Sequence, residues 1–214
     1  MAIVMIGGEK GGSGKSTIAT NLTVWLSKEG RDVVLVDADK QGTASNWLAR
    51  REEYYPDLPQ IHKSVQHGNI FKAVQDLSTR YEDVVIDAGG RDSEELRSGM
   101  VACQSIYVPL RPSQADIETA AHVAELIKLA RGFAPDLDAR AVITMAPTNP
   151  FINERKEAME LLSELPEFKL SRSIIRDRKV YRDAMAEGLG VVEMDNSKAK
   201  AELQILAQEI FTNG

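Results

Sequence analysis

Short apolar runs alternate along this chain with longer stretches in which apolar residues recur every three to four positions. The runs have the length and composition of buried parallel strands and cover residues 3–6, 32–36, 83–86, 104–109 and 139–145. A further short strand is expected at 61–65. Helical spacing links Ile18 to Leu26, Ala44 to Glu53, Ile70 to Leu77, Ile117 to Ala130 and Ala199 to Ile210. This alternation predicts an α/β fold, a doubly wound, mostly parallel sheet with helices on both faces.

One glycine-rich segment stands between the first predicted strand and the first predicted helix. Residues 7–17 read Gly-Gly-Glu-Lys-Gly-Gly-Ser-Gly-Lys-Ser-Thr. Such a segment lets backbone N–H groups surround a phosphate, and the following helix adds the positive end of its dipole. Lys15 is then placed to reach the β- and γ-phosphates, and the Ser16 hydroxyl to hold Mg²⁺. The predicted nucleotide-binding residues are Gly11, Gly12, Ser13, Gly14, Lys15, Ser16 and Thr17.

The segment departs from the general phosphate-loop pattern G-x-x-x-x-G-K-[ST], because Glu9 stands where that pattern has glycine. It fits the variant K-G-G-x-G-K-[ST], in which a second lysine, Lys10, opens the loop. The alternative is a glycine-rich turn with two surface lysines. The coincidence of a strand, the glycines, Lys15-Ser16 and a periodic helix favours phosphate binding.

Acidic residues follow two of the predicted strands. Asp37 and Asp39 end the second strand, and Asp87 ends the strand at 83–86. The carboxyl edge of a parallel sheet is where α/β proteins bind ligands, so Asp87 is predicted to act on Mg²⁺ through water. Gly89 and Gly90 leave room for their loop to approach a γ-phosphate. Capping acids in a turn are the alternative.

With these motifs, the chain resembles ParA-family ATPases of the MinD/ParA branch, most closely the short plasmid-type partition ATPases called ParF. The resemblance implies a single P-loop ATPase domain over residues 1–214, without a separate N-terminal DNA-binding domain. It implies ATP and Mg²⁺ as cofactors, with Ser16, Asp37 and Asp87 around the metal. The implied catalytic residues are Lys10, Lys15 and Asp39. Lys10 would reach the partner's phosphates in a homodimer formed on ATP binding, and Asp39 would orient the attacking water.

The same resemblance places other segments. Gln41 is expected to contact the dimer partner, residues 109–116 to lie near the dimer interface, and the loop 146–150 to lie near adenine. The chain departs from the common family pattern at two points. Lys40 replaces the proline usual after the second aspartate. Asp87 is followed by Ala-Gly-Gly where the family often has Thr-Pro-Pro, a form closer to the short plasmid members. Arg91 is a candidate phosphate contact, with a solvated loop arginine as the alternative.

Basic residues gather near the C-terminus of a chain whose formal net charge is −6. Residues 169–182 contain six bases and one acid. This asymmetry predicts nonspecific, salt-sensitive contact with DNA phosphates. The predicted DNA-binding residues are Arg172, Arg176, Arg178, Lys179, Arg182, Lys198 and Lys200, the last two placed just before the final helix. A solvated face with ion pairs is the alternative.

The remaining features exclude several classes of protein. Cys103 is the only cysteine, so no intrachain disulfide forms, and it is expected to be a small core residue in a cytoplasmic protein. His62, His67 and His122 have no metal-ligand spacing with one another or with Cys103. No apolar stretch approaches a membrane span, and the acidic final helix does not suit an anionic membrane.

The sequence therefore predicts an ATP-dependent partitioning ATPase. Its ATP-bound dimer would bind nonspecific nucleoid DNA, and a ParB-like adaptor would stimulate hydrolysis, segregating a plasmid or chromosome. An alternative keeps the ATPase and changes the cargo to a protein assembly such as a chemotaxis cluster or a carboxysome. A third hypothesis, a P-loop metabolic synthetase, is disfavoured by Lys10.

Overall fold

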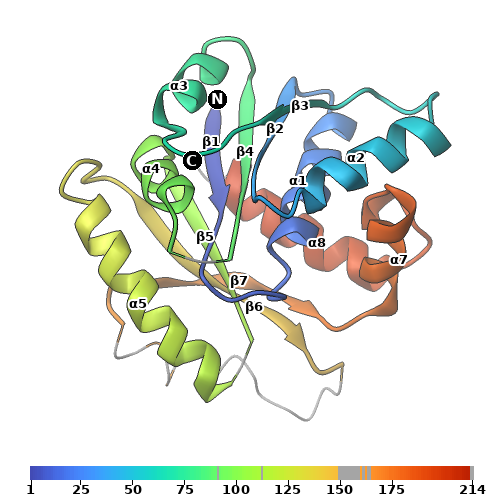
Figure 1. Cartoon of the computed structure of the whole chain (residues 1–214). Helices are drawn as coiled ribbons and strands as arrows, with labels where there is room; N and C mark the ends of the chain where they lie inside the picture. Colours follow the sequence, from blue (N-terminus) through green and yellow to red (C-terminus); the bar gives the residue numbers. More distant parts are fainter. Residues whose placement is uncertain (91, 112, 149–159, 161, 163–164, 213–214) are drawn as a thin grey trace.

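The computed structural model describes residues 1–90, 92–111, 113–148, 160, 162 and 165–212, and within them a seven-stranded sheet in which each strand pair is parallel (Figure 1). The strands are β1 (Ala2–Ile6), β2 (Val33–Ala38), β3 (His62–Val65), β4 (Asp83–Ala88), β5 (Ser105–Leu110), β6 (Asp138–Ala146) and β7 (Lys169–Arg176). Their order across the sheet is β3-β2-β4-β1-β5-β6-β7. The predicted α/β fold with a parallel sheet is confirmed.

Helices cover both faces of this sheet. They are α1 (Lys15–Lys28), α2 (Thr43–Tyr54), α3 (Phe71–Ser78), α4 (Glu94–Ala102), α5 (Gln114–Ala130), α7 (Lys179–Glu187) and α8 (Ser197–Phe211), with a short 3₁₀ turn at Val191–Glu193. Helices α3, α4 and α5 pack on one face, and α1, α2, α7 and α8 on the other (Figure 1).

Alternation along each strand divides the apolar core into two layers. In β1, Ile3 and Met5 face the layer under α3, α4 and α5, while Val4 and Ile6 face the layer under α1 and α8. Both faces are covered, so the strands are apolar on both sides, as their continuous runs in the sequence predict. Burying one such apolar side chain completely stabilises the folded state by about 1.5–3 kcal/mol relative to leaving it exposed.

The register of the sheet determines where the polar residues meet. Asp37 of β2 lies directly opposite Asp87 of β4, and Ile6, the last residue of β1, also pairs with Asp87. The glycine-rich loop leaves β1 at the same edge. The carboxyl ends of three neighbouring strands therefore place the loop and the two acids side by side.

Several elements were not expected from the sequence. Helix α4 is one: Ser93 caps it by accepting a hydrogen bond from the Leu96 N–H at 3.1 Å, and Leu96 and Met100 are buried. Strand β7 and helix α7 together occupy the basic segment. Helix α8 begins at Ser197, so Lys198 and Lys200 lie in its first turn and not before it.

Smaller expectations have mixed outcomes. Ala121, predicted on the apolar face of α5, is exposed, whereas Val123 and Leu126 fill that face. Cys103 is in the core as predicted, and burial raises the pKa of its thiol to about 12. In the part of the chain that the structure describes, no helix has the length and apolar character needed to cross a membrane. Arg91, Pro112, Asn149 and Pro150 lie outside the described residues.

Candidate nucleotide and metal site

The glycine-rich loop takes the conformation that its composition favours. Gly8, Gly12 and Gly14 have φ values of 141°, 69° and 95°, which side chains rarely allow. Gly14 also stands at the start of α1, where no side chain caps the helix. The first amide N–H groups of α1 therefore lack a capping side chain and are available to an anion.

Lys15 points its charge into this loop. The residue is 6% exposed, and its Nζ donates a hydrogen bond to the Lys10 carbonyl at 2.7 Å. Burial lowers the pKa of Lys15, while the charges of Asp87 and Asp39 act in the opposite direction. A phosphate group offers this ammonium stronger acceptors than one carbonyl, so the arrangement suits an anion bound in the loop.

The two acids at the end of β2, Asp37 in the strand and Asp39 just after it, are held differently. Asp37 is buried, and its Oδ2 accepts hydrogen bonds from the Ser45 N–H at 2.8 Å and the Ser45 hydroxyl at 2.5 Å. Asp39 is partly exposed and accepts one bond, from the Gln41 N–H at 3.0 Å. Asp37 is thus fixed by Ser45 of the following helix, α2, and Asp39 keeps most of its acceptor capacity for other groups.

Asp87 is the most unusual side chain of the site. It is fully buried, and neither carboxylate oxygen makes a hydrogen bond of normal geometry. Burial raises the pKa of Asp87 to about 7; Ser16 and Lys15 lower it, and Asp37 and Asp39 raise it further. A buried carboxylate without partners is costly, and a divalent cation would satisfy both oxygens. Together with the Ser16 hydroxyl, these hard oxygen donors fit Mg²⁺.

Two glycines allow the loop after β4 to approach the site closely. A Cβ atom on Gly89 would lie 3.2 Å from Asp39 Oδ1. A Cβ atom on Gly90 would lie 3.0 Å from Lys15 Nζ and 3.2 Å from the Glu9 carbonyl oxygen. A side chain at either position would force its neighbours to shift by a few tenths of an ångström, so glycine permits this close approach.

Lys10 reaches a side chain that the sequence did not single out. Its Nζ lies 3.9 Å from Asp116 Oδ2, and Asp116 is buried. The Ser113 hydroxyl donates a 2.6 Å hydrogen bond to the same oxygen. Within this one chain, the Lys10 side chain therefore has an acid of α5 as its partner, while the Lys10 backbone carbonyl accepts the hydrogen bond of Lys15.

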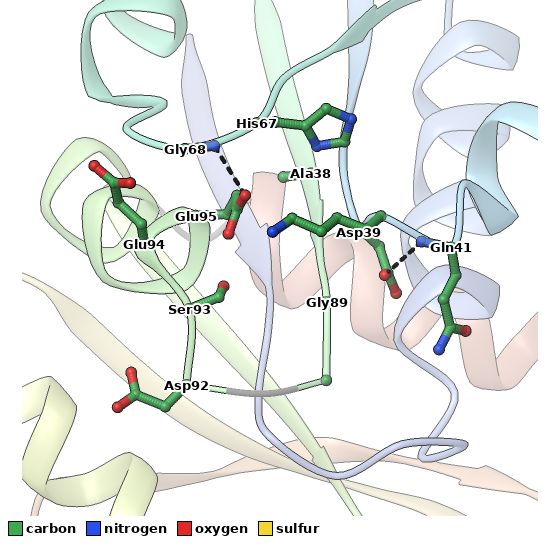
Figure 2. A pocket seen from close by; sticks show the side chains of 12 residues that line it. Ala38, Asp39, Gln41, His67, Gly68, Gly89, Asp92, Ser93, Glu94 and Glu95 are labelled. Atoms are coloured by element: carbon green, nitrogen blue, oxygen red, sulfur yellow. Dashed lines mark hydrogen bonds between the residues drawn. The ribbon is translucent and has the colours of Figure 1, made fainter.

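A cavity of about 580 Å³ opens beside Asp39. Figure 2 shows Asp39 and Gln41 on one side of it and Ser93, Glu94 and Glu95 of the α4 region on the other. Glu95 closes one wall by accepting a 2.8 Å hydrogen bond from the Gly68 N–H. Carboxylates outnumber bases in the lining, which is formed by Ala38, Asp39, Lys40, Gln41, His67, Gly68, Gly89, Gly90, Asp92, Ser93, Glu94 and Glu95.

A second, smaller cavity of about 160 Å³ adjoins the other side of the phosphate loop. Its lining includes Ser13, Gly14 and Thr17 together with Met145, Tyr181 and the bases Arg176, Arg178 and Arg182. Met145 has a positive φ of 51° at an irregular point of the β6–β7 ladder. The neighbouring Thr144 hydroxyl donates to the Ser13 carbonyl at 2.9 Å and so ties β6 to the loop.

Three of the seven predicted DNA-binding residues are paired with acids of this chain. Arg178 donates two hydrogen bonds to Glu202, at 3.0 and 2.6 Å. Lys179 pairs with Asp183 at 2.9 Å, and Arg182 with Asp177 at 2.5 Å. Arg172 is exposed on β7, and Lys198 and Lys200 lie on α8. Glu202 and Asp183 stand outside the basic segment, which is why its charge count overstated the unpaired positive charge.

The structure brings the predicted nucleotide and metal residues to one edge of the sheet, while their roles stay predictions. Sequence reasoning assigned no role at this site to Ser45, Thr144 or Met145, and it included Asp116 only within the range 109–116 expected near a dimer interface. Only Ser45 had a local signal, as a hydroxyl at the start of a helix after the acidic turn. Asp116 and Thr144 meet the loop across more than 100 residues of chain, and Met145 lies at an irregular point of its strand, which no spacing rule detects.

Comparison with known proteins identifies the family of this chain. Residues 4–191 match the sequence model of the CobQ/CobB/MinD/ParA nucleotide-binding domain. The chain belongs to this family. The predicted resemblance to the ParA/MinD group is thereby confirmed.

Individual members of the family show likeness over most of the chain. The maintenance of carboxysome distribution protein A of Halothiobacillus neapolitanus is 29% identical over 187 residues, 86% of this chain and 84% of that protein. The chromosome-partitioning ATPase Soj of Thermus thermophilus is 26% identical, over 72% of this chain and 74% of that protein.

Solved structures agree on the fold. The structure of apo McdA from Cyanothece has a TM-score of 0.77 at 14% identity and covers 98% of this chain and 99% of that chain. The septum site-determining protein MinD of Pyrococcus horikoshii, complexed with Mg-ADP, has a TM-score of 0.76 at 19% identity, with 98% and 96% covered. At these identities the likeness concerns the fold alone.

Proposed function

We propose that this protein is a Mg²⁺-dependent ATPase that distributes a protein assembly inside the cell. The observation that carries the ATPase part is Asp87, whose buried oxygens make no normal hydrogen bond beside Lys15 and an uncapped helix N-terminus. Membership of a nucleotide-binding family supports it. Relatives named for carboxysome distribution support the cargo part, which was the alternative in the sequence analysis.

In the proposed mechanism each residue of the site has a separate role. The loop amides and Lys15 hold the phosphates, and Ser16 and Asp87 hold the metal, with Asp37 as a fixed neighbouring acid. The chemistry that bound Mg²⁺ supplies is neutralisation of charge on the phosphate oxygens. Asp39 orients the attacking water from the partly exposed side of the site. Lys10 leaves Asp116 and completes the site of a second protomer, which couples hydrolysis to dimerisation.

The adenine base is proposed to enter the cavity beside Met145. This cavity adjoins the loop on the side of Thr17 and Tyr181, away from Asp39. The resemblance had placed adenine at residues 146–150, so the proposal moves the contact to the end of β6 and the start of α7. The bases Arg176 and Arg182 would then border the nucleotide.

The test of the ATPase measures phosphate release and nucleotide binding by the wild type and by Lys15→Ala, Asp39→Ala and Lys10→Ala. We expect Lys15→Ala to lose both binding and hydrolysis. Asp39→Ala should bind ATP, form dimers in light scattering and hydrolyse slowly. Lys10→Ala should bind ATP and remain monomeric. A wild type that neither binds nor hydrolyses ATP would refute the proposal.

Plasmid or chromosome segregation with a ParB-like adaptor is the second candidate, supported by likeness to Soj and to a ParA protein of Rhizobium radiobacter. Both candidates use nonspecific DNA as a track, so DNA binding in ATP does not separate them. Imaging does. In cells lacking this protein, mislocalised protein assemblies with faithful plasmid and chromosome inheritance support the first candidate, and DNA loss supports the second.

A further inference from the structure

Three side chains from separate segments meet beside the phosphate loop. Glu9 comes from the loop, Asp92 from the segment after β4, and His122 from α5. His122 Nε2 lies 3.2 Å from Glu9 Oε1 and 3.8 Å from Asp92 Oδ2. One ligand atom of each residue lies within 4.8 Å of the other two.

Glu9 has no task in phosphate binding. It occupies the position at which the general phosphate-loop pattern has glycine, and its side chain is 15% exposed. A carboxylate in a loop that surrounds an anion is repelled by that anion unless a positive charge offsets it. The Glu9 side chain instead contacts His122, so a cation that offsets its negative charge would lie beside this histidine.

Asp92 is already prepared as an ionised ligand. Arg97 donates hydrogen bonds to its two oxygens, at 2.6 and 2.5 Å. These bonds hold the pKa of Asp92 below its usual range, although burial acts in the opposite direction; the charge of Arg97 and the nearby His122 add to the lowering. Arg97 offsets the charge of Asp92, and Glu9 adds a second carboxylate beside the imidazole. Hydrogen bonds that orient a ligating carboxylate from behind are typical of metal sites.

We propose that Glu9, Asp92 and His122 bind a divalent transition-metal ion such as Zn²⁺ or Co²⁺. An imidazole nitrogen with two carboxylate oxygens is a donor set for these ions, and three protein ligands leave a position for water. The Mg²⁺ position at Ser16 and Asp87 differs, because its donors are oxygens only. The bound ion would join the phosphate loop, the segment after Gly90 and α5.

Isothermal titration with Zn²⁺ and with Co²⁺ tests the site, using full-length protein without a histidine tag and excess Mg²⁺ to fill oxygen-only positions. We expect one transition-metal ion per chain, and visible absorption bands from bound Co²⁺. Removing a ligand in His122→Ala or Glu9→Gln should weaken binding by at least about tenfold. His62→Ala is the matched control, because His62 is exposed on β3 and should leave the affinity unchanged.

A second readout protects against a misfolded variant. Saturating Co²⁺ should raise the thermal midpoint of the wild type and of His62→Ala, and leave that of folded His122→Ala unchanged. Equal Co²⁺ affinity in the wild type and His122→Ala, or no binding at all, would overturn the proposal. These measurements use no nucleotide, so they succeed or fail independently of the proposed ATPase activity.

Discussion

The acids at the carboxyl ends of β2 and β4 and the bases of residues 169–182 are both charged clusters, but their surroundings differ. Asp87 is buried without a normal hydrogen bond, and Lys15 beside it is held by one backbone carbonyl. Lys179 and Arg182 are exposed and already paired with Asp183 and Asp177. Buried charge without partners indicates a ligand, because its desolvation must be offset. Exposed paired charge needs no ligand to explain it.

The largest expected contrast is in catalysis. Asp87→Asn should lower the rate of ATP hydrolysis by about 10²- to 10³-fold, because it weakens the hold on the metal ion that would neutralise charge on the reacting phosphates. Lys179→Ala should change the rate by less than about twofold, because a paired surface lysine contributes little. Phosphate release measures both. Similar losses in the two variants would remove the distinction between the clusters.

The pH dependence of stability sharpens the acidic side of the comparison. The folded, metal-free protein has a pKa of about 7 at Asp87 against an ordinary value of 3.8. Between these values the folded state binds more protons than the unfolded chain, so the free energy of unfolding falls as pH rises. The limit is about 1.4 kcal/mol per pH unit. Asp87→Asn should lack this contribution.

The pH-dependent contribution of Asp87 can be isolated by urea unfolding of the wild type and Asp87→Asn, with a chelator and at pH values from 5 to about 8. The variant should gain stability relative to the wild type as pH rises. Added Mg²⁺ should bind the wild type more tightly at higher pH, since its ligand must be deprotonated. A difference between the two proteins that does not vary with pH would contradict the assigned pKa.

Within the basic segment, one arginine should behave unlike its neighbours. Arg178 and Glu202 are 16% and 14% exposed, and Tyr181 also lies against Glu202. Arg178→Ala leaves that carboxylate without its main partner and should cost about 1–3 kcal/mol. Lys179→Ala, at an 81% exposed side chain, should cost less than about 0.5 kcal/mol. Urea midpoints measure both, and equal costs would show that burial does not separate the pairs.

The smallest expected effect concerns DNA. If Lys179 contacted a phosphate, Lys179→Ala would reduce the salt dependence of DNA binding by about one ion. Because Lys179 already pairs with Asp183, we expect a change of less than about half that. Binding of the ATP-loaded protein to nonspecific DNA at several salt concentrations provides the measurement. A full one-ion change would restore this residue to the DNA hypothesis.

The sequence by itself determined the fold class and the positions of the phosphate-binding elements. Apolar runs and helical spacing are local patterns, and the glycine-rich loop, Asp37 and Asp87 directly follow such runs. In a parallel sheet the ends of neighbouring strands meet at one edge, so locating the strands located the site. Helix α4 escaped notice although Ser93 and the apolar Leu96 and Met100 carried a local signal for it.

Only the tertiary structure decided which charges have partners. Lys10 meets Asp116, Arg178 meets Glu202, and His122 meets Glu9 and Asp92 across long stretches of chain. Composition counts charges along a segment, whereas pairing depends on which elements pack together in three dimensions. The same packing leaves Asp87 buried without a normal hydrogen bond. Desolvation and pairing are properties of the folded chain, and they separate a ligand site from an ordinary charged surface.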